Sequence, residues 1–397
     1  MRRYVQIWSL PGAPILLLAG FLGRLPVAMV PLALLLLVES STGSYASAGL
    51  ATAAYGLATA AVAPLLGRLA DRIGPRPVLL VTGLAYPAAL AGLLAVLRAE
   101  QPPAVLFAAS ALAGAAMPLI SSSVRALWIR IAPQGSLLHT AYALDAIAVE
   151  CVFVLGPVLV ALLVTFAAPT LPLLVAAVLA LAGSVAVALS GPARAWRRVG
   201  LDARCGPSSP LRSPGMRVLL GSTAVVMFGL GCLEVAVPAW AEEGGLPAAS
   251  GLLLGVWALG SAAGGLWFGA RQLRMSLPRQ YRWGLLAIAV GFAPLAAAQD
   301  PWVLGALLFL GGTAIAPTIS VQNALVASMA PVRATTEAFT WLTTVVFGAS
   351  ALGAAVAGGL VGQPSGIALA LGLATASAFA AAGIASVAGH RLLAVPA

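Results

Sequence analysis

The sequence predicts an all-α membrane protein whose twelve transmembrane helices form two pseudo-symmetric six-helix bundles. First, the 397-residue chain is 61% hydrophobic and 8% charged, which leaves too few polar side chains to cover a soluble core of this size. Second, apolar runs longer than about 18 residues, enough to cross a hydrocarbon layer roughly 30 Å thick, recur along the chain. Third, the two halves of the chain resemble each other. The alternating segments of about ten residues that a membrane β-barrel needs are absent from the sequence.

The first apolar run predicts a membrane span over residues 13–38. Arg2 and Arg3 precede it, as in a signal peptide, but the run from Pro14 to Val38 is longer than the apolar region of a cleaved signal. Apolar length, with proline and glycine clusters at most turns, predicts the other spans. They are expected at 46–66, 77–97, 103–124, 139–166, 169–190, 216–240, 248–270, 282–299, 302–327, 335–361 and 366–389.

The longest polar connection lies near the middle of the chain, at residues 191–215. It is rich in proline, glycine and arginine. It predicts a basic cytoplasmic linker between an N-terminal bundle over 1–190 and a C-terminal bundle over 216–397. A solvated linker is favoured over the alternative, a basic amphipathic helix on the inner leaflet around Trp196–Val199.

The basic residues are distributed unevenly between the two sides of the predicted membrane. All of them are arginine, and with the N-terminus in the cytoplasm nineteen of the twenty-one lie on the inner side. Arg98 falls in an outer loop and Arg24 falls inside a span, whereas the outer loops carry five acidic residues. Because cytoplasmic loops of membrane proteins are enriched in basic residues, both termini are predicted to be cytoplasmic, in a bacterial inner membrane. The net charge of +10 therefore reflects topology and does not indicate a nucleic-acid partner.

Similar residues recur in the two halves at nearly constant spacing. A spacing of 202 residues and a spacing of 197 residues, each close to half the chain, favour a parallel repeat of six spans. The first spacing pairs Gly49 with Gly251, Tyr55 with Trp257, Gly67 with Gly269 and Arg72 with Arg274, and the second pairs Ala141 with Ala338, Tyr142 with Phe339 and Gly156 with Gly353.

The stretch GRLADRIGPRP, residues 67–77, places four charged residues between the second and third predicted spans. Asp71 is expected to cap the free N–H groups at the start of the next helix, and Gly74 is expected to permit a turn. Gly67 would allow a close helix contact, while Arg72 and Arg76 would stay near anionic lipid headgroups.

The spacing G-x-x-x-D-R-x-G-x-R resembles the cytoplasmic signature of the major facilitator superfamily. The resemblance implies that Asp71 is a latch residue, which bonds across to the other half and stabilises the outward-facing state. Pro75 departs from the basic residue usual there, and the second copy, GARQLR at 269–274, lacks the acid. The latch would therefore be one-sided.

A second resemblance concerns the span over 139–166. Drug–proton antiporters of this family carry a glycine- and proline-rich motif there, of which this chain keeps Gly156 and Pro157 without the preceding glycines. The arginine that such antiporters often carry midway along the fourth span is missing from 103–124. The partial match favours export over uptake.

Ionisable residues inside the spans are the candidates for proton coupling or substrate binding, because charge is costly within a membrane. Arg24 and Glu150 are expected at similar depth, either as a static ion pair or as a pair that faces a central cavity and binds substrate or exchanges a proton. Glu234 and Asp145 are further candidates, although Asp145, like Glu337, could instead pair with arginines of nearby loops.

The sequence carries no pattern typical of an enzyme. It has no serine–histidine–aspartate set, no phosphate-binding loop and no spacing of ligands for a metal, and Cys151, Cys205 and Cys232 are scattered. We therefore expect a monomeric secondary transporter without cofactor or metal, most simply one that couples proton entry to efflux of a small amphipathic or drug-like compound. Uptake or symport of a small metabolite is the alternative, and a non-transporting sensor or scaffold is the remote one.

Overall fold

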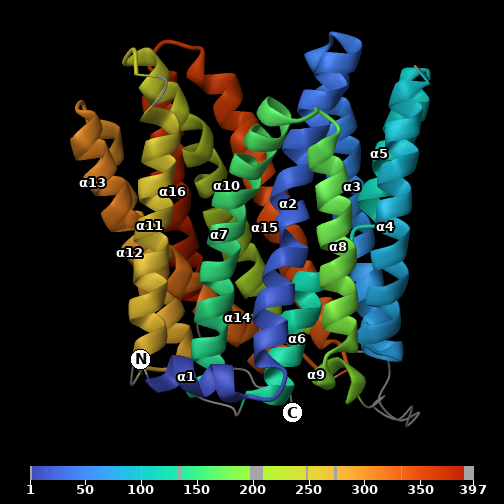
Figure 1. The fold of residues 1–397 in the computed structure, drawn as a ribbon. Helices are drawn as coiled ribbons and strands as arrows, with labels where there is room; N and C mark the ends of the chain where they lie inside the picture. The colour runs from blue at the N-terminus through green and yellow to red at the C-terminus, as the bar shows by residue number, and fades with distance from the viewer. Residues whose placement is uncertain are drawn as a thin grey trace. The chain divides into compact units, whose positions relative to one another are not determined.

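A computed structural model of the chain describes residues 2–99, 101–132, 136–196, 209–246, 249–271, 275–331 and 333–388. Throughout these ranges the regular secondary structure is helical (Figure 1). The helices are α1 (Arg2–Ser9), α2 (Ala13–Thr42), α3 (Tyr45–Ile73), α4 (Pro75–Arg98), α5 (Pro103–Ala115), α6 (Ile120–Ile131), α7 (Ser136–Phe166), α8 (Leu171–Leu189), α9 (Gly191–Arg194), α10 (Pro214–Glu243), α11 (Ala249–Ala270), α12 (Leu277–Phe292), α13 (Pro301–Gly312), α14 (Ile315–Met329), α15 (Thr335–Val361) and α16 (Gly366–Val387), with short 3-10 turns η1 (Pro210–Arg212) and η2 (Leu295–Ala297).

Among the described residues, eleven helical segments are long and apolar enough to cross a membrane. Two of them are pairs of helices, α5 with α6 and α13 with α14, which form the fourth and tenth predicted spans. The predicted ninth span, 282–299, is not among the eleven, because α12 has 16 residues and rises only about 24 Å. The total of twelve spans thus stays a prediction, whereas the all-helical membrane fold is confirmed.

Proline and small polar residues start many of the helices. Pro75, Pro103 and Pro214 each occupy the first helical position, where a missing N–H costs nothing. At the start of α13 the side chain of Asp300 accepts hydrogen bonds from the backbone N–H groups of Trp302 and Val303, at 2.8 and 3.1 Å.

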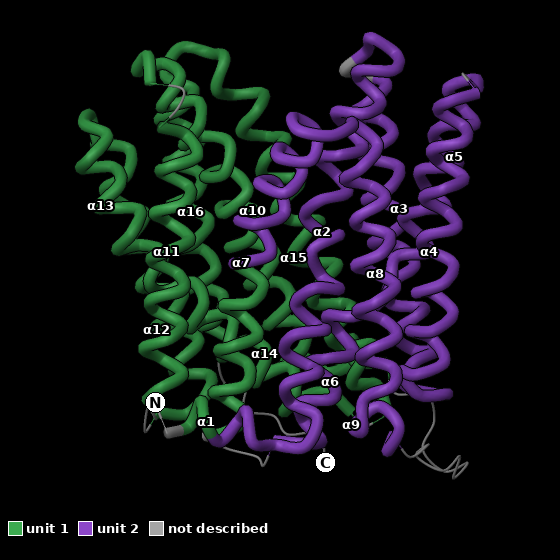
Figure 2. Tube along the Cα trace, in the orientation of Figure 1, with its two compact units in different colours: residues 1–5, 133–150, 207–397 green, residues 6–132, 151–206 purple. Residues whose placement is uncertain are grey.

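The chain divides into two compact units (Figure 2). Unit 1 comprises residues 1–5, 133–150 and 207–397, and unit 2 comprises residues 6–132 and 151–206. Helix α7 belongs to both, since it changes unit between Glu150 and Cys151. The predicted bundle borders at 190 and 216 stay a prediction, and residues 197–208 of the predicted linker lie outside the described part of the chain.

Corresponding helices of the two halves pack in corresponding ways within each unit. In unit 2, α2 packs against α3 and α8, α3 against α5, and α4 against α5 and α8. In unit 1, α10 packs against α11 and α16, α11 against α13, and α12 against α13 and α16. The repeated packing agrees with the six-span repeat that the two residue spacings predict.

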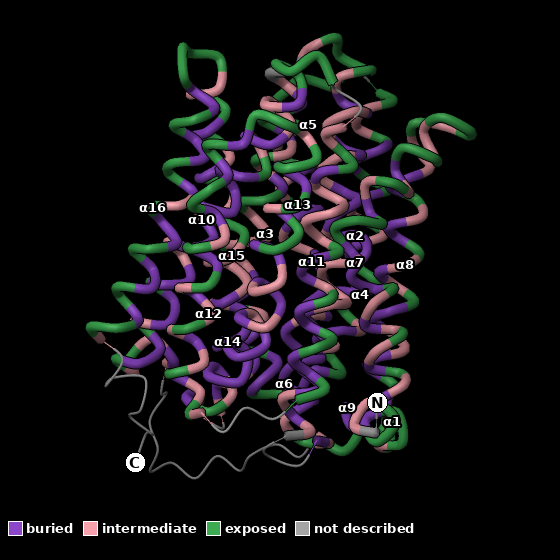
Figure 3. Tube along the Cα trace, turned by 90° about the vertical axis from the view of Figure 1, so that its left-hand side faces the viewer, coloured by how far each residue is buried: buried purple, intermediate pink, exposed green. Residues whose placement is uncertain are grey.

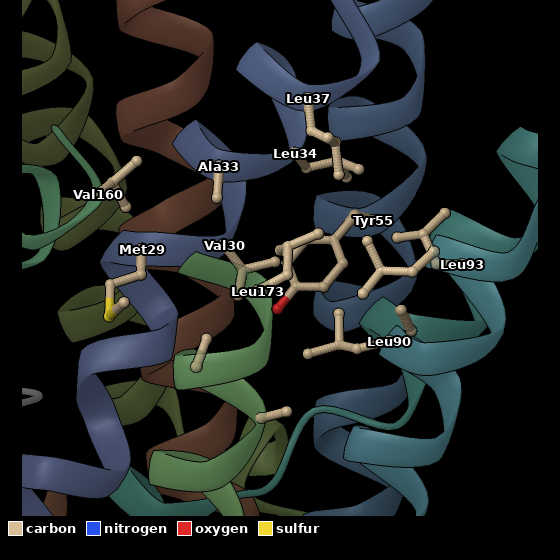
Figure 4. Close-up of a cluster of buried hydrophobic side chains, with 14 of the residues drawn as sticks. Met29, Val30, Ala33, Leu34, Leu37, Tyr55, Leu90, Leu93, Val160 and Leu173 are labelled. Carbon is tan, nitrogen blue, oxygen red and sulfur yellow. The ribbon is translucent and has the colours of Figure 1, made fainter. Parts of the chain in front are cut away.

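The core of unit 2 is an apolar cluster built around the ring of Tyr55 (Figure 4). The hydroxyl of Tyr55 shares a 2.7 Å hydrogen bond with that of Tyr86 and lies 3.3 Å from the sulfur of Met117. Along α16, buried and exposed residues alternate with helical periodicity (Figure 3). Large apolar side chains on other helices, such as Leu57 and Leu259, are exposed. Exposed apolar side chains on most helices are what a lipid environment requires.

The amphipathic helix α1 was not predicted. The Tyr4 hydroxyl donates a 2.6 Å hydrogen bond to the Leu266 carbonyl of α11, and both residues belong to unit 1. Partial burial raises the pKa of Tyr4 above its ordinary value, so the hydroxyl remains a donor at neutral pH.

Candidate functional site

The fourth and tenth spans are both broken by a proline. Pro118 lies between α5 and α6. Thr313 and Ala314 separate α13 from α14, and Pro317 is the third residue of α14. A proline ring clashes with the carbonyl four residues earlier and supplies no N–H, so the helix is interrupted there. Within a membrane, the backbone groups freed at such a break need other partners.

In unit 1 the backbone of α11 lies directly against the broken tenth span. The carbonyl oxygens of Phe309 and Thr313 occupy the places that a Cβ would take at Gly260 and Gly264. On the other side of the contact, a Cβ on Gly312 would lie 2.5 Å from the carbonyl oxygen of Trp257. Only glycine permits an approach this close, and it brings the side chains of α11 to the freed backbone groups.

A hydroxyl group contacts the backbone at each break. In unit 2, Thr59 Oγ1 of α3 lies 2.9 Å from the carbonyl oxygen of Gly114, the residue four before Pro118. In unit 1, Ser261 Oγ of α11 accepts a 3.2 Å hydrogen bond from the backbone N–H of Ala316, in the first turn of α14. Thr59 and Ser261 are 202 residues apart, so the two hydroxyl groups occupy equivalent places on α3 and α11.

Ser261 also contacts a predicted site residue. Ser261 is 1% exposed, and its hydroxyl donates a 3.0 Å hydrogen bond to Glu150 Oε1 of α7. The part of α7 that carries Glu150 is fixed in unit 1, where Ile147 packs at Gly265 and Thr140 Oγ1 donates to the Gly269 carbonyl at 2.9 Å. A chain of hydrogen bonds therefore leads from the Ala316 amide through Ser261 to the Glu150 carboxylate.

A second predicted acid, Glu234 of α10, lies in the same unit. Ser350 Oγ of α15 donates to Glu234 Oε2 at 3.4 Å, and the charge of Glu234 acts electrostatically on Glu150. The structure thus brings together two of the predicted candidates, from two helices of unit 1.

The other predicted ionisable residues lie elsewhere. Arg24 is 3% exposed within α2 of unit 2, and Asp145 is 2% exposed within α7 of unit 1; each interacts with its surroundings. The expected Arg24–Glu150 pair would join residues of different units and stays a prediction. Glu337 lies in the first turn of α15, where Trp341 Nε1 donates to it at 3.3 Å.

The charged signature over 67–77 is mostly helical and not a loop. Gly67, Asp71 and Arg72 lie in the last turns of α3, and the connection to α4 is Gly74, whose φ of 93° confirms the predicted turn. Asp71 is buried and lies in the last turn of α3, whereas α4 begins at Pro75 with Gly74, which has no side chain, at its N-cap position. Capping of α4 by Asp71 stays a prediction. Because α3 continues to Ile73, Asp71 lies near the C-terminus of that helix.

Asp71 has a basic neighbour in its own unit. It interacts electrostatically with Arg130 at the end of α6, whose guanidinium lies 3.8 Å from the ring centre of Trp196. The same ring lies against Gly74. Trp196, at the start of the predicted linker, is thus fixed to unit 2, whereas Arg72 and Arg76 are exposed. A latch from Asp71 to the other half stays a prediction.

The span-five residues Gly156 and Pro157 lie inside α7. A Cβ on Gly156 would lie 2.6 Å from the Cβ of Ala28 in α2, and at the equivalent place in unit 1 the carbonyl of Phe228 in α10 occupies the Cβ position of Gly353. Gly156 therefore permits a close helix contact.

No three His, Cys, Asp or Glu side chains of the described residues come close enough together to hold a metal ion.

Comparison with known proteins decides the family. The profile described as Major Facilitator Superfamily matches residues 16–354. The chain belongs to the Major Facilitator Superfamily. A curated relative from Sinorhizobium fredii, described as the uncharacterized MFS-type transporter y4rN, is 32% identical over 272 residues. That match spans 66% of this chain and 66% of the relative, just under two thirds of the relative's length.

Solved transporter structures share the fold. A bacterial homologue of the iron transporter ferroportin, in an outward-facing state, matches with a TM-score of 0.75 and 18% identity, over 95% of this chain and 99% of its own. The human organic anion transporter MFSD10 (TETRAN) matches with a TM-score of 0.69 and 20% identity, over 96% and 98% of the two chains. At these identities the similarity concerns the fold alone.

Ser261 and the two breaks were missed in the sequence, although a signal for them was present. Pro118 and Pro317 interrupt corresponding apolar runs, 199 residues apart, and paired interruptions of this kind indicate a binding region in transporters built from repeats. The spacing of 202 that pairs Tyr55 with Trp257 also pairs Thr59 with Ser261.

Proposed function

We propose that the chain is a secondary active transporter of the bacterial inner membrane, with both termini in the cytoplasm. It exports a small amphipathic or drug-like compound by alternating access and takes up protons in exchange. Glu150 is the group that carries the proton.

The hydrogen-bond chain from Ala316 through Ser261 to Glu150 is the observation that carries this proposal. A carboxyl group inside a predicted span is costly when ionised and needs a functional reason. Within the described part of the chain, Glu150 accepts a hydrogen bond from the Ser261 hydroxyl and has a second carboxylate, Glu234, within electrostatic range. Such a pair of acids is stabilised by uptake of a proton or another cation, which is the property that an antiporter needs.

The contact with the broken tenth span supports a conformational role for that proton. Discontinuous helices in transporters form binding sites for substrates and coupling ions near the middle of the membrane. Because Glu150 is connected to the first turn of α14, its protonation state can favour one conformation over another.

A transport screen with an imposed pH gradient tests coupling and direction together. Everted membrane vesicles that contain the full chain are energised, and a panel of amphipathic compounds is added while a pH-sensitive dye reports the gradient. We expect at least one compound to dissipate the gradient in the wild-type protein, and none to do so in Glu150→Gln. The matched control is Glu242→Gln, since Glu242 is an exposed acid at the end of α10 and should leave coupling intact.

Proton-coupled transport that persists in a stable Glu150→Gln protein would exclude Glu150 as the proton carrier and leave Glu234 and Asp145 as candidates. Accumulation in right-side-out vesicles, together with no response in everted ones, would exclude export and favour symport of a metabolite. Absence of counter-flow for every compound in proteoliposomes would favour a sensor or scaffold.

A further inference from the structure

Ser261 makes two hydrogen bonds of opposite sense. Its oxygen accepts from the Ala316 amide at 3.2 Å, and its proton is donated to Glu150 at 3.0 Å. A hydroxyl has one proton and two lone pairs. When the proton points toward Glu150, a lone pair is left to accept from the Ala316 amide, so both bonds require this one orientation of the hydroxyl.

The protonation state of Glu150 determines whether that arrangement is favoured. An ionised carboxylate only accepts, so it orients the Ser261 hydroxyl and polarises it, which strengthens the bond from the Ala316 amide. A protonated carboxyl is a weaker acceptor and can itself donate to Ser261, in competition with the amide. The positive end of α14 also favours a negative charge, and that stabilisation is lost when Glu150 is neutral.

We propose that Ser261 is a positioning residue that couples the protonation of Glu150 to the break between α13 and α14. When Glu150 is ionised, Ser261 holds the first turn of α14 against α11; when Glu150 takes a proton, this contact weakens and the break at Thr313–Ala314 becomes free to bend. The inference rests on the proposed role of Glu150 as proton carrier and names the element on which the proton acts.

Other ionisable groups around this part of α7 are accounted for. α7 itself carries His139 and Asp145, α10 carries Glu234, and the first turn of α15 carries Glu337. Helices α11 and α14, over Ala249–Ala270 and Ile315–Met329, contain no ionisable side chain. Of these groups, Glu234 is the one whose charge acts on Glu150, so it is included in the test.

Unit 2 supplies a matched control. Thr59 contacts the equivalent break through the Gly114 carbonyl, and its other contact is the carbonyl of Tyr55, not a carboxylate. Removal of the Thr59 hydroxyl therefore removes the same kind of support from a broken span without touching a titrating group.

The test is a pH titration of the full chain in liposomes, followed by infrared spectroscopy of protonated carboxyl groups. The band of Glu150 is assigned by its loss in Glu150→Gln. We expect Ser261→Ala to move the midpoint of this band to higher pH by about one unit, because a hydrogen bond to the ionised form is lost. Glu234→Gln should move it to lower pH, Ser261→Thr should restore the wild-type midpoint, and Thr59→Val should leave it unchanged.

Amide hydrogen exchange of the peptide that contains Ala316 is the second readout. After correction for the intrinsic rate, exchange in the wild-type protein should be faster below the midpoint than above it. In Ser261→Ala it should be fast on both sides, and in Thr59→Val it should keep the wild-type pattern.

A Glu150 band with the same midpoint in Ser261→Ala and in the wild-type protein would overturn the inference and leave the proposed function standing. So would Ala316 exchange that does not depend on pH in the wild-type protein. Absence of any titrating band that is lost in Glu150→Gln would instead contradict the proposed function itself.

Discussion

At the scale of single residues, two acids of the predicted spans are held by hydroxyl groups. Ser261 donates to Glu150 and Ser350 donates to Glu234. A hydrogen bond to a charged group contributes about 1.5–3 kcal/mol, whereas an ionised carboxylate within a membrane costs at least about as much. One hydroxyl therefore does not stabilise the ionised form decisively, and a proton or cation can compete for the site.

The two serines should differ in importance. Ser350→Ala should change the pH dependence of transport less than Ser261→Ala, because the Ser350–Glu234 contact is longer, at 3.4 Å, and exposed. Transport rates measured across a pH series for both variants check this. A larger effect of Ser350→Ala would mean that Glu234 is the dominant proton carrier.

Asp71 is the next residue whose charge has a known neighbour. Asp71→Asn should leave the protein in the membrane but slow transport, since a neutral amide loses the charge-assisted bonds of the carboxylate and its interaction with Arg130. The measurement is the transport rate normalised to the amount of protein, with Glu242→Gln as control. Wild-type rates in a well-expressed Asp71→Asn protein would argue against any latch at this position.

Trp196 should contribute to the stability of unit 2. Trp196→Ala removes the ring that stacks on Arg130 and covers Gly74, and a cation–π contact contributes about 0.5–2 kcal/mol depending on its burial. We expect a lower melting temperature in detergent. Trp302→Ala, at a position that is 81% exposed, should have no comparable effect.

At the scale of helices, the contact between α11 and the broken tenth span depends on the absence of side chains. Gly260 and Gly264 lie one turn apart and each receives a backbone carbonyl. Backbone atoms cannot move aside as the end of a flexible side chain can, so this contact tolerates no added atom.

The effect of a glycine-to-alanine substitution on stability should therefore depend on its position along α11. Gly264→Ala should destabilise the protein by about 1–3 kcal/mol, as overpacking of a core does, and should also impair transport because the contact lies beside Ser261. Gly255→Ala on the same helix has open space around it and should be neutral or slightly stabilising. Melting temperatures of the two variants check the prediction, and equal values would contradict the contact.

At the scale of the whole molecule, the chain consists of two compact units with similar internal packing and an apolar exterior. This is the organisation that membership of the Major Facilitator Superfamily implies, and the arginine distribution predicts how it is oriented.

Cysteine labelling tests that orientation. In a background without the native cysteines, a cysteine at Ala203 should react only from the cytoplasmic side, and one at Gln363 only from the outer side. Gln363 is exposed between α15 and α16, whereas the neighbouring Gly366 is packed against a backbone carbonyl and would not accept a side chain. Labelling of Ala203→Cys from outside would invert the topology.

Much of the fold could be predicted from the sequence, because a membrane span must be long and apolar. The spans expected at 335–361 and 248–270 agree with α15 and α11 to within one residue. The breaks could not be located in this way, since a proline in an apolar run is compatible with both a kink and an interruption. The acids Glu150 and Glu234 were predicted as candidates from the cost of charge in a membrane. Ser261 was not, because a hydroxyl carries no such cost and its partners lie on helices distant in sequence.

The division of α7 between two units has a consequence for biosynthesis. Residues 133–150 leave the ribosome before residues 207–397, yet they belong to the same compact unit. N-terminal parts of a chain generally fold first during synthesis. This half of α7, with its acids Asp145 and Glu150, is therefore made before its packing partners. It reaches its final contacts only after Ser261 and the later helices have been synthesised. Assembly of unit 1 is consequently one of the last events in the maturation of the protein.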